Sequence, residues 1–426
     1  MKSVEKYKVK KLQGSINCNI NVPGSKSITN RALFLASMAN GVSTLRNVLF
    51  SDDSRSFFSC MQELGYDITV NEEARMAVVK GGSPCNKAII NVRSAGTSAR
   101  FFTALLSASP GEYEIQATEQ MCRRPMKPLC EALESLGVEI CYLGEKWFLP
   151  FRVKGGKKRG GEISLYAEQS SQFLSSLLMT GGLYDEGLKI HHIGKEIAKP
   201  YISMTMEMMK QFGCEVCNSG QTYVIKPGNH YRSLDYKIEP DVSAACYFFA
   251  LAVLLGGRVL VDDVHLSSMQ GDIRFLEILK LLGAEVHDTS EGVEVKGPAG
   301  GIYNGIDVDL NDCSDQTMTL AALAIFAKTP TTIHNINHIK LQESDRIQAI
   351  LNELKKMGII CNEINDGIII YPGTPKPTLV ETYNDHRMAM AFTLVGLKAG
   401  GITIDNPSCV SKTFENYFDI IDTLCK

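Results

Sequence analysis

The sequence predicts a two-domain α/β protein built from six copies of one folding unit. Its 426 residues exceed what a single hydrophobic core usually supports. An amphipathic helix that ends in glycine and leads into a strand recurs at a spacing of roughly seventy residues, as in tandem structural units. A second helix, apolar on nearly every side, lies between successive copies.

The amphipathic helices share one pattern, seen in FFSCMQELGYDI, LCEALESLGVEI, MTMEMMKQFGCEV, FLEILKLLGAEV and ILNELKKMGIIC. Each leaves one face polar, which is typical of a helix on the outside of a domain. The closing glycine suits a left-handed cap, which other residues adopt only at a cost. These glycines are Gly65, Gly137, Gly213, Gly283 and Gly358. A sixth copy, FENYFDIIDTLCK, has the helix without the glycine.

The second set of helices is apolar nearly all round and reads ALFLASM, FFTALLSA, FLSSLLMT, YFFALAVLL, MTLAALAIFA and MAMAFTLVGL. A helix without a polar face must be enclosed by other elements. Strand, buried helix, strand and outer helix in six copies predict two layered domains of three copies each. The repeat alone places the boundary near residues 228–236.

Composition excludes several other classes of protein. Hydrophobic residues make up 44% and charged residues 21%, which predicts a chain folded throughout. The net charge of -3, with scattered basic residues, argues against nucleic-acid or membrane partners. The first residues lack a signal-peptide core, and the run Ala244 to Leu255 is too short to span a bilayer, so a cytoplasmic location is expected. The thirteen cysteines stand mostly singly, and the CxxC of Cys214 and Cys217 has no second pair, so no metal site is predicted.

Polar residues gather directly before each buried helix, in PGSKSITNR, RSAGTSAR, EQSSQ, EPDVSAA, DCSDQTMT and YNDHRMAM. Plain helix capping would explain their serines and aspartates. It does not explain the cations, which oppose the helix dipole. An anion bound at the helix start would account for them, and the recurrence favours this interpretation. The cations are Lys26, Arg31, Arg100, His386 and Arg387. The nucleotide-loop pattern fails at GSKS, where Ser25 separates Gly24 from Lys26.

Further cations precede the outer helices, namely Arg123, Arg124, Lys199, Arg346 and Lys412. Together they exceed what one phosphate needs, so two anionic ligands are expected. The candidates for proton transfer are Asp241, Asp315, Glu343, Asp385 and His386. A carboxylate among several cations stays ionised and can act as a base. The residues alone leave the roles open.

At these motifs the chain resembles the EPSP synthases (3-phosphoshikimate 1-carboxyvinyltransferases) of the enolpyruvyl transferase family. The resemblance spans residues 22–418 and rests on PGSKSITNRALFLA, SAGTSAR, RRPM, SSQFLSSLLM, MQGDIRF, ESDRI, YNDHRMAM and KTF. It implies two inside-out α/β barrels of three βαβαββ units each, which close on substrate like a clamp. It also implies that the first strand joins the second domain, so we expect an N-terminal domain at residues 23–237 and a C-terminal domain at residues 1–22 plus 238–426.

The resemblance also implies a reaction of the shikimate pathway. The 5-hydroxyl of shikimate 3-phosphate adds to C2 of phosphoenolpyruvate, and the tetrahedral intermediate expels phosphate, without metal or organic cofactor. Asp315 is expected to take the hydroxyl proton, Glu343 to handle the proton at C3, and Lys26 to stabilise charge. The expected ligands of shikimate 3-phosphate are Lys26, Ser27, Arg31, Ser170, Ser171, Gln172, Asp315 and Gln342. Those of phosphoenolpyruvate are Lys26, Gly96, Arg124, Gln172, Arg346, Arg387 and Lys412. A monomer is expected.

Four positions depart from the family pattern: Gln342 where Lys is frequent, Ala198 for Ser, and Ser94 and His338 for Asn. The loss of a cation at Gln342 and of a hydroxyl at Ala198 is expected to affect substrate affinity rather than the type of reaction. Lys340 or Asn337 would be the residues to compensate. Two alternatives are an enolpyruvyl transferase acting on UDP-N-acetylglucosamine and a non-catalytic anion-binding relative. Cys122 lies only two residues before Arg124, unlike the reactive Cys of the former, and the SSQ and YNDHR motifs favour the shikimate enzyme. The presence of the expected catalytic and binding residues argues against a non-catalytic relative; these are Lys26, Asp315, Glu343 and Arg387.

Overall fold

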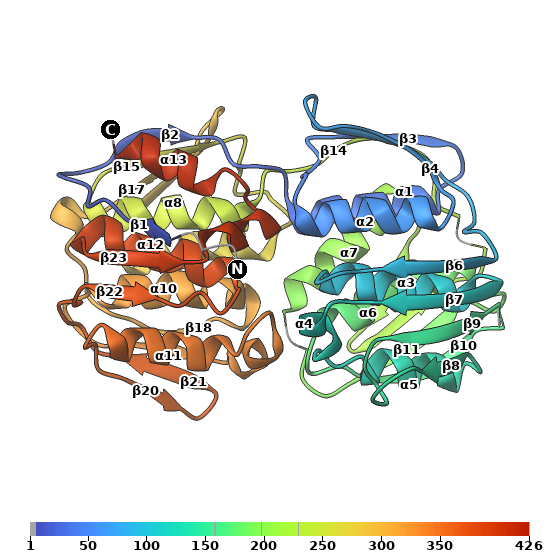
Figure 1. The fold of residues 1–426 in the computed structure, drawn as a ribbon. Coiled ribbons are helices and arrows are strands. Elements are labelled where there is room, and N and C mark those ends of the chain that lie inside the picture. The colour runs from blue at the N-terminus through green and yellow to red at the C-terminus, as the bar shows by residue number, and fades with distance from the viewer. Residues whose placement is uncertain (1–5, 157–158, 197, 229, 426) are drawn as a thin grey trace. The chain divides into compact units, whose positions relative to one another are not determined.

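The computed structural model describes residues 6–156, 159–196, 198–228 and 230–425 (Figure 1). The chain divides into two compact units. The N-terminal unit is Gly24–Ile238, and the C-terminal unit is Met1–Pro23 with Glu239–Lys426. Residues 6–23 therefore fold with residues 239–425, which are distant from them in the sequence.

In the N-terminal unit three buried helices form the interior: α1 (Lys26–Ser37), α3 (Gly96–Ala108) and α6 (Ser171–Thr180). Helix α3 packs against both α1 and α6. The amphipathic helices are α2 (Asp52–Glu63), α5 (Lys127–Ser135) and α7 (Lys199–Gln211). A short helix, α4 (Glu119–Cys122), precedes α5.

Three four-stranded sheets accompany these helices, and each contains one parallel pair and two antiparallel pairs. The first has the order β14 (Asp235–Lys237), β3 (Val42–Arg46), β5 (Met76–Lys80), β4 (Asp67–Asn71). The second is β6 (Lys87–Asn91), β7 (Gly111–Gln116), β9 (Phe151–Gly155), β8 (Glu139–Tyr142). The third is β10 (Gly161–Tyr166), β11 (Leu188–Ile193), β13 (Thr222–Ile225), β12 (Val216–Ser219). Side chains of β9 and β10 alternate between buried and exposed, so one face of each sheet covers the helices.

The C-terminal unit repeats this plan around buried helices α8 (Val242–Leu255), α10 (Thr317–Ala324) and α12 (His386–Ala399), which pack on one another. Its outer helices are α9 (Phe275–Leu281), α11 (Arg346–Lys356) and α13 (Tyr417–Leu424). Two sheets have four strands: β16 (Glu285–Asp288), β17 (Gly292–Lys296), β15 (Arg258–Asp262), β2 (Asn17–Ile20), and β18 (Asp307–Asp309), β19 (Thr331–His334), β21 (Gly367–Ile370), β20 (Cys361–Ile364).

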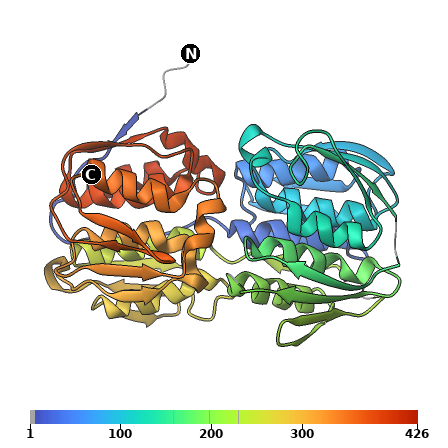
Figure 2. The same ribbon diagram turned by 90° about the horizontal axis from the view of Figure 1, so that it is seen from below.

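The last sheet has three strands, in the order β1 (Lys6–Lys8), β23 (Ile402–Asp405), β22 (Thr378–Val380). The sixth copy has no antiparallel partner of its own for β23 among the described residues, and β1 takes that position with Lys6 opposite Asp405. Figure 2 shows the blue β1 beside the red C-terminal elements. The N-terminal segment thus completes two sheets of the C-terminal unit, through β1 and β2.

The predicted fold class is confirmed: each unit holds three copies of the repeat, with helices inside and strands outside (Figure 1). Within the described residues the strands form six separate sheets rather than one closed barrel. The five closing glycines all have a positive φ, between 78° at Gly358 and 92° at Gly213, which confirms the left-handed caps. None of the helices in the described stretches has the length and apolar run that crossing a bilayer requires.

Candidate active site

The starts of the three buried helices of the N-terminal unit meet. Asn30 Nδ2 donates to Thr97 Oγ1 over 2.7 Å, which joins the second turn of α1 to the first turn of α3. Arg31 Nη2 reaches Ser175 Oγ of α6 at 3.4 Å. Because the unpaired N–H groups of a helix start attract anions, this end of the unit is a candidate anion site.

Lys26 is the first residue of α1 and Ser27 the second. The Lys26 ammonium lies 3.5 Å from Asp53 Oδ2, and both side chains are mostly buried. Asp53 belongs to the first turn of α2, so the lysine is oriented by the outer helix of the same copy. The backbone oxygen of Ser27 accepts a hydrogen bond from Arg31 Nη1 at 3.1 Å.

Arg31 is only 1% exposed and is held by neutral oxygens. Its Nε donates to Thr205 Oγ1 at 2.8 Å, and its guanidinium lies 5.5 Å from the centre of the Phe101 ring. Burial lowers the pKa of Arg31 to about 10, which still leaves it charged at neutral pH. A buried cation that is held by neutral oxygens favours an incoming anion.

Gly96 begins α3 beneath two arginines. A Cβ atom at this position would lie 2.8 Å from Arg100 Nη1 and 2.9 Å from Arg124 Nη1. Both arginines are buried, at 2% and 7% exposure, and Arg100 is tied to the backbone oxygens of Gly96 and Pro125. Glycine therefore lets two guanidinium groups approach the helix start, which suits a doubly charged anion.

The start of α6 carries the third group of predicted ligands. Ser170 caps the helix by accepting from the Gln172 backbone N–H at 3.2 Å, and Ser171 is 8% exposed. The Gln172 Oε1 atom is buried and has no hydrogen-bond partner among the described residues. Such an atom is costly unless a ligand or water pairs with it, so Gln172 suits contact with a donor on a substrate.

In the C-terminal unit the core of the candidate site is Arg346, the first residue of α11. Its side chain is 1% exposed and contacts three carboxylates. Nε donates to Asp385 Oδ2 at 2.8 Å, Nη1 to Asp315 Oδ1 at 2.9 Å and Nη2 to Glu343 Oε2 at 2.8 Å. Burial alone would lower the pKa of Arg346, but Asp385, Glu343 and Asp315 outweigh burial and raise it. The guanidinium is a permanent charge that orients all three acids.

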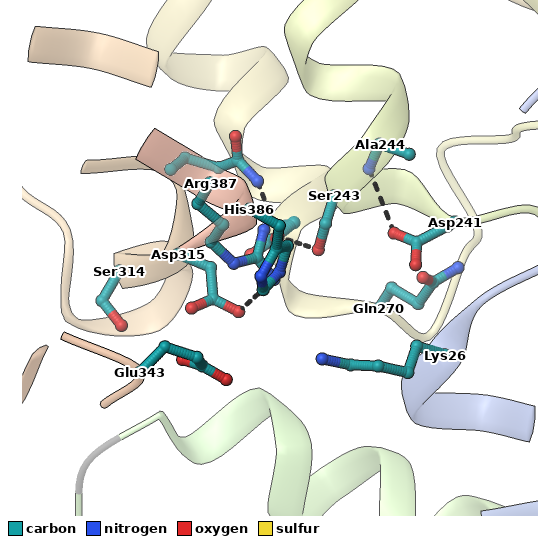
Figure 3. Close-up of polar contacts among 12 residues, drawn as sticks. Lys26, Asp241, Ser243, Ala244, Gln270, Ser314, Asp315, Glu343, His386 and Arg387 are labelled. Carbon is teal, nitrogen blue, oxygen red and sulfur yellow. Dashed lines mark hydrogen bonds and ion pairs between the residues drawn. The ribbon is translucent and has the colours of Figure 1, made fainter. Parts of the chain in front are cut away.

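Two further cations complete this cluster. Arg387 Nη2 donates to Asp315 Oδ2 at 2.6 Å, and Figure 3 shows the two side chains pointing toward each other. Lys412 Nζ lies 3.2 Å from Glu343 Oε1. The three cations Arg346, Arg387 and Lys412 thus balance the three carboxylates Asp315, Glu343 and Asp385. Asp315 is thus held between Arg346 and Arg387, and Glu343 between Arg346 and Lys412.

Asp385 and His386 are more deeply buried than the other two acids of the cluster, Asp315 and Glu343. Asp385 is 0% exposed and caps α12 by accepting from the Arg387 backbone N–H at 3.0 Å. Ser344 Oγ also donates to it at 3.1 Å. His386 is 1% exposed. Asp385 therefore orients the Arg346 guanidinium and caps α12 rather than facing a ligand. Asp241 likewise caps α8 through the Ala244 N–H (Figure 3).

Asp272 is a site-forming residue that sequence reasoning missed. It is 2% exposed in the short helix Gly271–Arg274 and accepts hydrogen bonds from Ser243 Oγ and, at 2.8 Å, from Gln316 Nε2. Burial, with a smaller contribution from Asp315, raises the pKa of Asp272 to about 6, although Arg387 acts to lower it. The available signal was the motif MQGDIRF, in which Asp272 is the one acidic residue.

Two of the four positions that depart from the family pattern, Gln342 and His338, lie next to residues of this cluster. Gln342 is half-buried and directly precedes Glu343. His338 Nε2 lies 2.8 Å from Ser314 Oγ, next to Asp315. Lys340 pairs with Glu363 at 2.5 Å, so it is engaged with the neighbouring strand rather than standing in for a cation at residue 342. In the N-terminal unit Ala198 precedes α7 and Ser94 Oγ lies 2.8 Å from Thr118 Oγ1.

The donor chemistry around the site is that of an anion receptor. Among the described residues no group of three or more His, Cys, Asp or Glu side chains could hold a metal ion. The cysteines in the described part of the chain form no disulfide.

The repeats and the cation-lined helix starts define a two-unit α/β enzyme for anionic substrates. The family model of EPSP synthase (3-phosphoshikimate 1-carboxyvinyltransferase) matches residues 8–421, so the chain belongs to this family.

Relatives and solved structures agree with this assignment. The chain is 42% identical over 411 residues, 96% of each chain, to the 3-phosphoshikimate 1-carboxyvinyltransferase of Trichormus variabilis. It is 37% identical to that of Vibrio campbellii, with both chains fully covered. The EPSP synthase structure from Acinetobacter baumannii has the same fold, with a TM-score of 0.81 at 23% identity over 99% of this chain and 98% of that chain.

Proposed function

We propose that the chain transfers the enolpyruvyl group of phosphoenolpyruvate to the 5-hydroxyl of shikimate 3-phosphate and releases phosphate. The observation that carries the proposal is the cluster in which Arg346 orients Asp315 and Glu343. Family membership supplies the reaction, and the cluster supplies acid–base groups and cations at one place. The enolpyruvyl transfer to UDP-N-acetylglucosamine is not favoured, because the family model and the named relatives are those of the shikimate enzyme.

In the proposed mechanism Asp315 accepts the proton of the 5-hydroxyl while the oxygen attacks C2. Glu343, starting as the acid, delivers a proton to C3 and takes one back when phosphate leaves. Asp315 passes the hydroxyl proton to the departing phosphate, so both residues return to their starting forms. Both acids already contact cations that neutralise the charge of their carboxylate forms. A positioned acid or base contributes about a hundred- to ten-thousandfold to the rate.

The cations supply binding and electrostatic stabilisation. Guanidinium forks match carboxylate and phosphate bidentately, so Arg124, Arg346 and Arg387 suit phosphoenolpyruvate. Lys26 and Lys412 act as point charges near the reacting centre. Gly96 and Gln172 complete the proposed phosphoenolpyruvate ligands. Shikimate 3-phosphate is assigned to Lys26, Ser27, Arg31, Ser170, Ser171, Gln172, Asp315 and Gln342.

The enzyme is proposed to act in the cytoplasm as a monomer, with the two units as its domains. Reduced cysteines and the absence of a bilayer-crossing helix from the described residues support the location. Light scattering of the purified protein tests the monomer.

The test of the function is phosphate release on mixing the protein with phosphoenolpyruvate and shikimate 3-phosphate. Mass spectrometry must detect the enolpyruvyl product in equal amount. Asp315→Ala, prepared identically, is the control for contaminating phosphatase. Release with UDP-N-acetylglucosamine instead, or no release with either acceptor, would overturn the proposal.

A further inference from the structure

The segment before α12 contains two consecutive residues in the left-handed conformation. Tyr383 and Asn384 both have a φ of 54°, and neither is glycine. Such residues persist only where surrounding structure holds them. They directly precede Asp385 and Arg387, so the direction of these two side chains depends on how the turn is held.

Glu353 holds one side of this turn. It lies on α11, two turns after Arg346, and its side chain is fully buried. Its Oε1 accepts a hydrogen bond from the Tyr383 hydroxyl at 2.8 Å, and its Oε2 accepts from the Glu381 backbone N–H at 3.1 Å. A buried carboxylate is costly unless its oxygens are paired, so these bonds fix the turn against α11.

Asp405 and Asn406 hold the other side. Asp405 Oδ1 accepts from Thr382 N at 2.8 Å and from Thr382 Oγ1 at 3.0 Å. Asn406 Nδ2 donates to Asn384 Oδ1 at 3.1 Å, just before the short helix Pro407–Lys412. The turn therefore joins the three elements that carry the cations of the site, Arg346, Arg387 and Lys412.

We propose that Glu353 is a positioning residue for the phosphoenolpyruvate subsite, because through Tyr383 it holds the left-handed turn that directs Arg387. The inference rests on the proposed function. Glu353 has a second possible role, as the partner of Lys356 at 2.7 Å. That lysine is 43% exposed and also lies 3.5 Å from Glu381 Oε2, and substituting either Lys356 or Tyr383 removes one partner of Glu353 at a time.

The Tyr383 hydroxyl is suited to remain the hydrogen-bond donor to Glu353. Burial raises the pKa of Tyr383, Asn352 opposes this and Glu353 adds to it, so the hydroxyl keeps its proton at neutral pH. Asn352 Nδ2 also donates to the hydroxyl, at 3.3 Å, which leaves the hydroxyl proton for Glu353.

The test is Tyr383→Phe, which removes one hydroxyl outside the substrate-binding residues. We expect the KM for phosphoenolpyruvate to rise about five- to twentyfold, because misplacing a binding group by a fraction of an ångström weakens its contact. The kcat and the KM for shikimate 3-phosphate should change by less than about threefold, since the acids remain on Arg346. Calorimetric titration with phosphoenolpyruvate gives the affinity without turnover.

The matched control is Lys356→Met, which removes the other partner of the same Glu353 oxygen. It should lower the melting temperature at least as much as Tyr383→Phe and leave the KM for phosphoenolpyruvate within about twofold of wild type. Glu353→Gln should give an intermediate rise, and combining it with Tyr383→Phe should add little, because both act through one contact.

The inference is overturned if Tyr383→Phe keeps the wild-type KM, or if Lys356→Met raises the KM as much. Should Tyr383→Phe fail to fold, the comparison of Glu353→Gln with Lys356→Met decides in the same way. Wild-type turnover in the same assay separates this outcome from a failure of the proposed function, which would abolish phosphate release in every sample.

Discussion

Asp315 and Arg387 are joined by a hydrogen bond of 2.6 Å, from the guanidinium Nη2 to the carboxylate Oδ2. The other oxygen of Asp315 accepts from Arg346. Asp315, the proposed base, thus accepts hydrogen bonds from Arg346 and Arg387, the two arginines that are proposed to bind phosphoenolpyruvate. In the free enzyme an internal anion stands where the substrate anion is expected to bind.

Asp315→Ala should therefore separate binding from catalysis. We expect turnover to fall by at least about a thousandfold, because the base is lost. We expect phosphoenolpyruvate to bind about three- to tenfold more tightly, because one competing negative charge is removed from beside the arginines. Phosphate release measures the first effect and calorimetric titration without acceptor measures the second.

Asp312→Ala is the control for that experiment. Asp312 lies three residues earlier and pairs with the exposed Arg274. Its substitution by Ala therefore also removes one negative charge, but outside the cluster. Unchanged or weaker phosphoenolpyruvate binding by Asp315→Ala would contradict the competition, and activity above a thousandth of wild type would contradict the role as base.

Gly96→Ala tests the approach of two guanidinium groups to the start of α3. The added Cβ would lie under 3.0 Å from both Arg100 and Arg124, which must shift. We expect the KM for phosphoenolpyruvate to rise about ten- to a hundredfold with little loss of stability, because the contacts are with side-chain ends. Steady-state kinetics and thermal unfolding measure these effects.

Gly82→Ala is the matched control, because a Cβ there meets no atom within 4 Å. It should leave the KM unchanged. A wild-type KM in Gly96→Ala would show that the arginines adjust freely and do not depend on the glycine.

Much of this site could be predicted because helix starts leave a local record. Capping residues and a polar-to-apolar change lie within a few residues of one another, so Lys26 and Arg387 could be placed at helix starts from the sequence. Their arrangement in six equivalent positions made the fold predictable as well. The residues in the family motifs were added by resemblance rather than by pattern.

The remainder depended on partners distant in the chain. Asp272 meets Gln316 across 44 positions, and Glu353 meets Tyr383 across 30. Each acid stands beside other polar residues, so from the sequence it looks like part of the solvated face of an ordinary helix until its partner is known. The pairing of β1 with β23 is likewise invisible locally, because an edge strand of three residues has no distinctive pattern.

Asp272→Asn should change how stability depends on pH. The pKa of Asp272 is raised from 3.8 to about 6 in the folded protein, so the folded state favours the protonated acid. Its stabilising contribution is complete below about pH 4 and is lost as the pH rises through about 6. Asparagine keeps an acceptor for Ser243 and Gln316 but has no proton to lose.

The stability of Asp272→Asn relative to wild type should thus improve by roughly 1–3 kcal/mol between about pH 4 and pH 7. Urea unfolding of both proteins at the two pH values measures this difference. The contributions of other titrating groups to stability are the same in both proteins, so they cancel. A difference that stays constant or changes in the opposite direction would show that the buried acid is not neutralised in the folded protein.

Gln342→Lys places a cation directly before Glu343, where the resemblance predicts one. Lys340 is held by Glu363, so it is not available to take this position. We expect the KM for shikimate 3-phosphate to fall about three- to tenfold, as one added charge contact with a phosphorylated ligand is worth roughly 1 kcal/mol. The exposed Gln62→Lys adds the same charge on α2 and should leave the KM unchanged. An unchanged KM in Gln342→Lys would mean that the half-buried glutamine already provides the contact, whereas an equal fall in both variants would assign the effect to net charge alone.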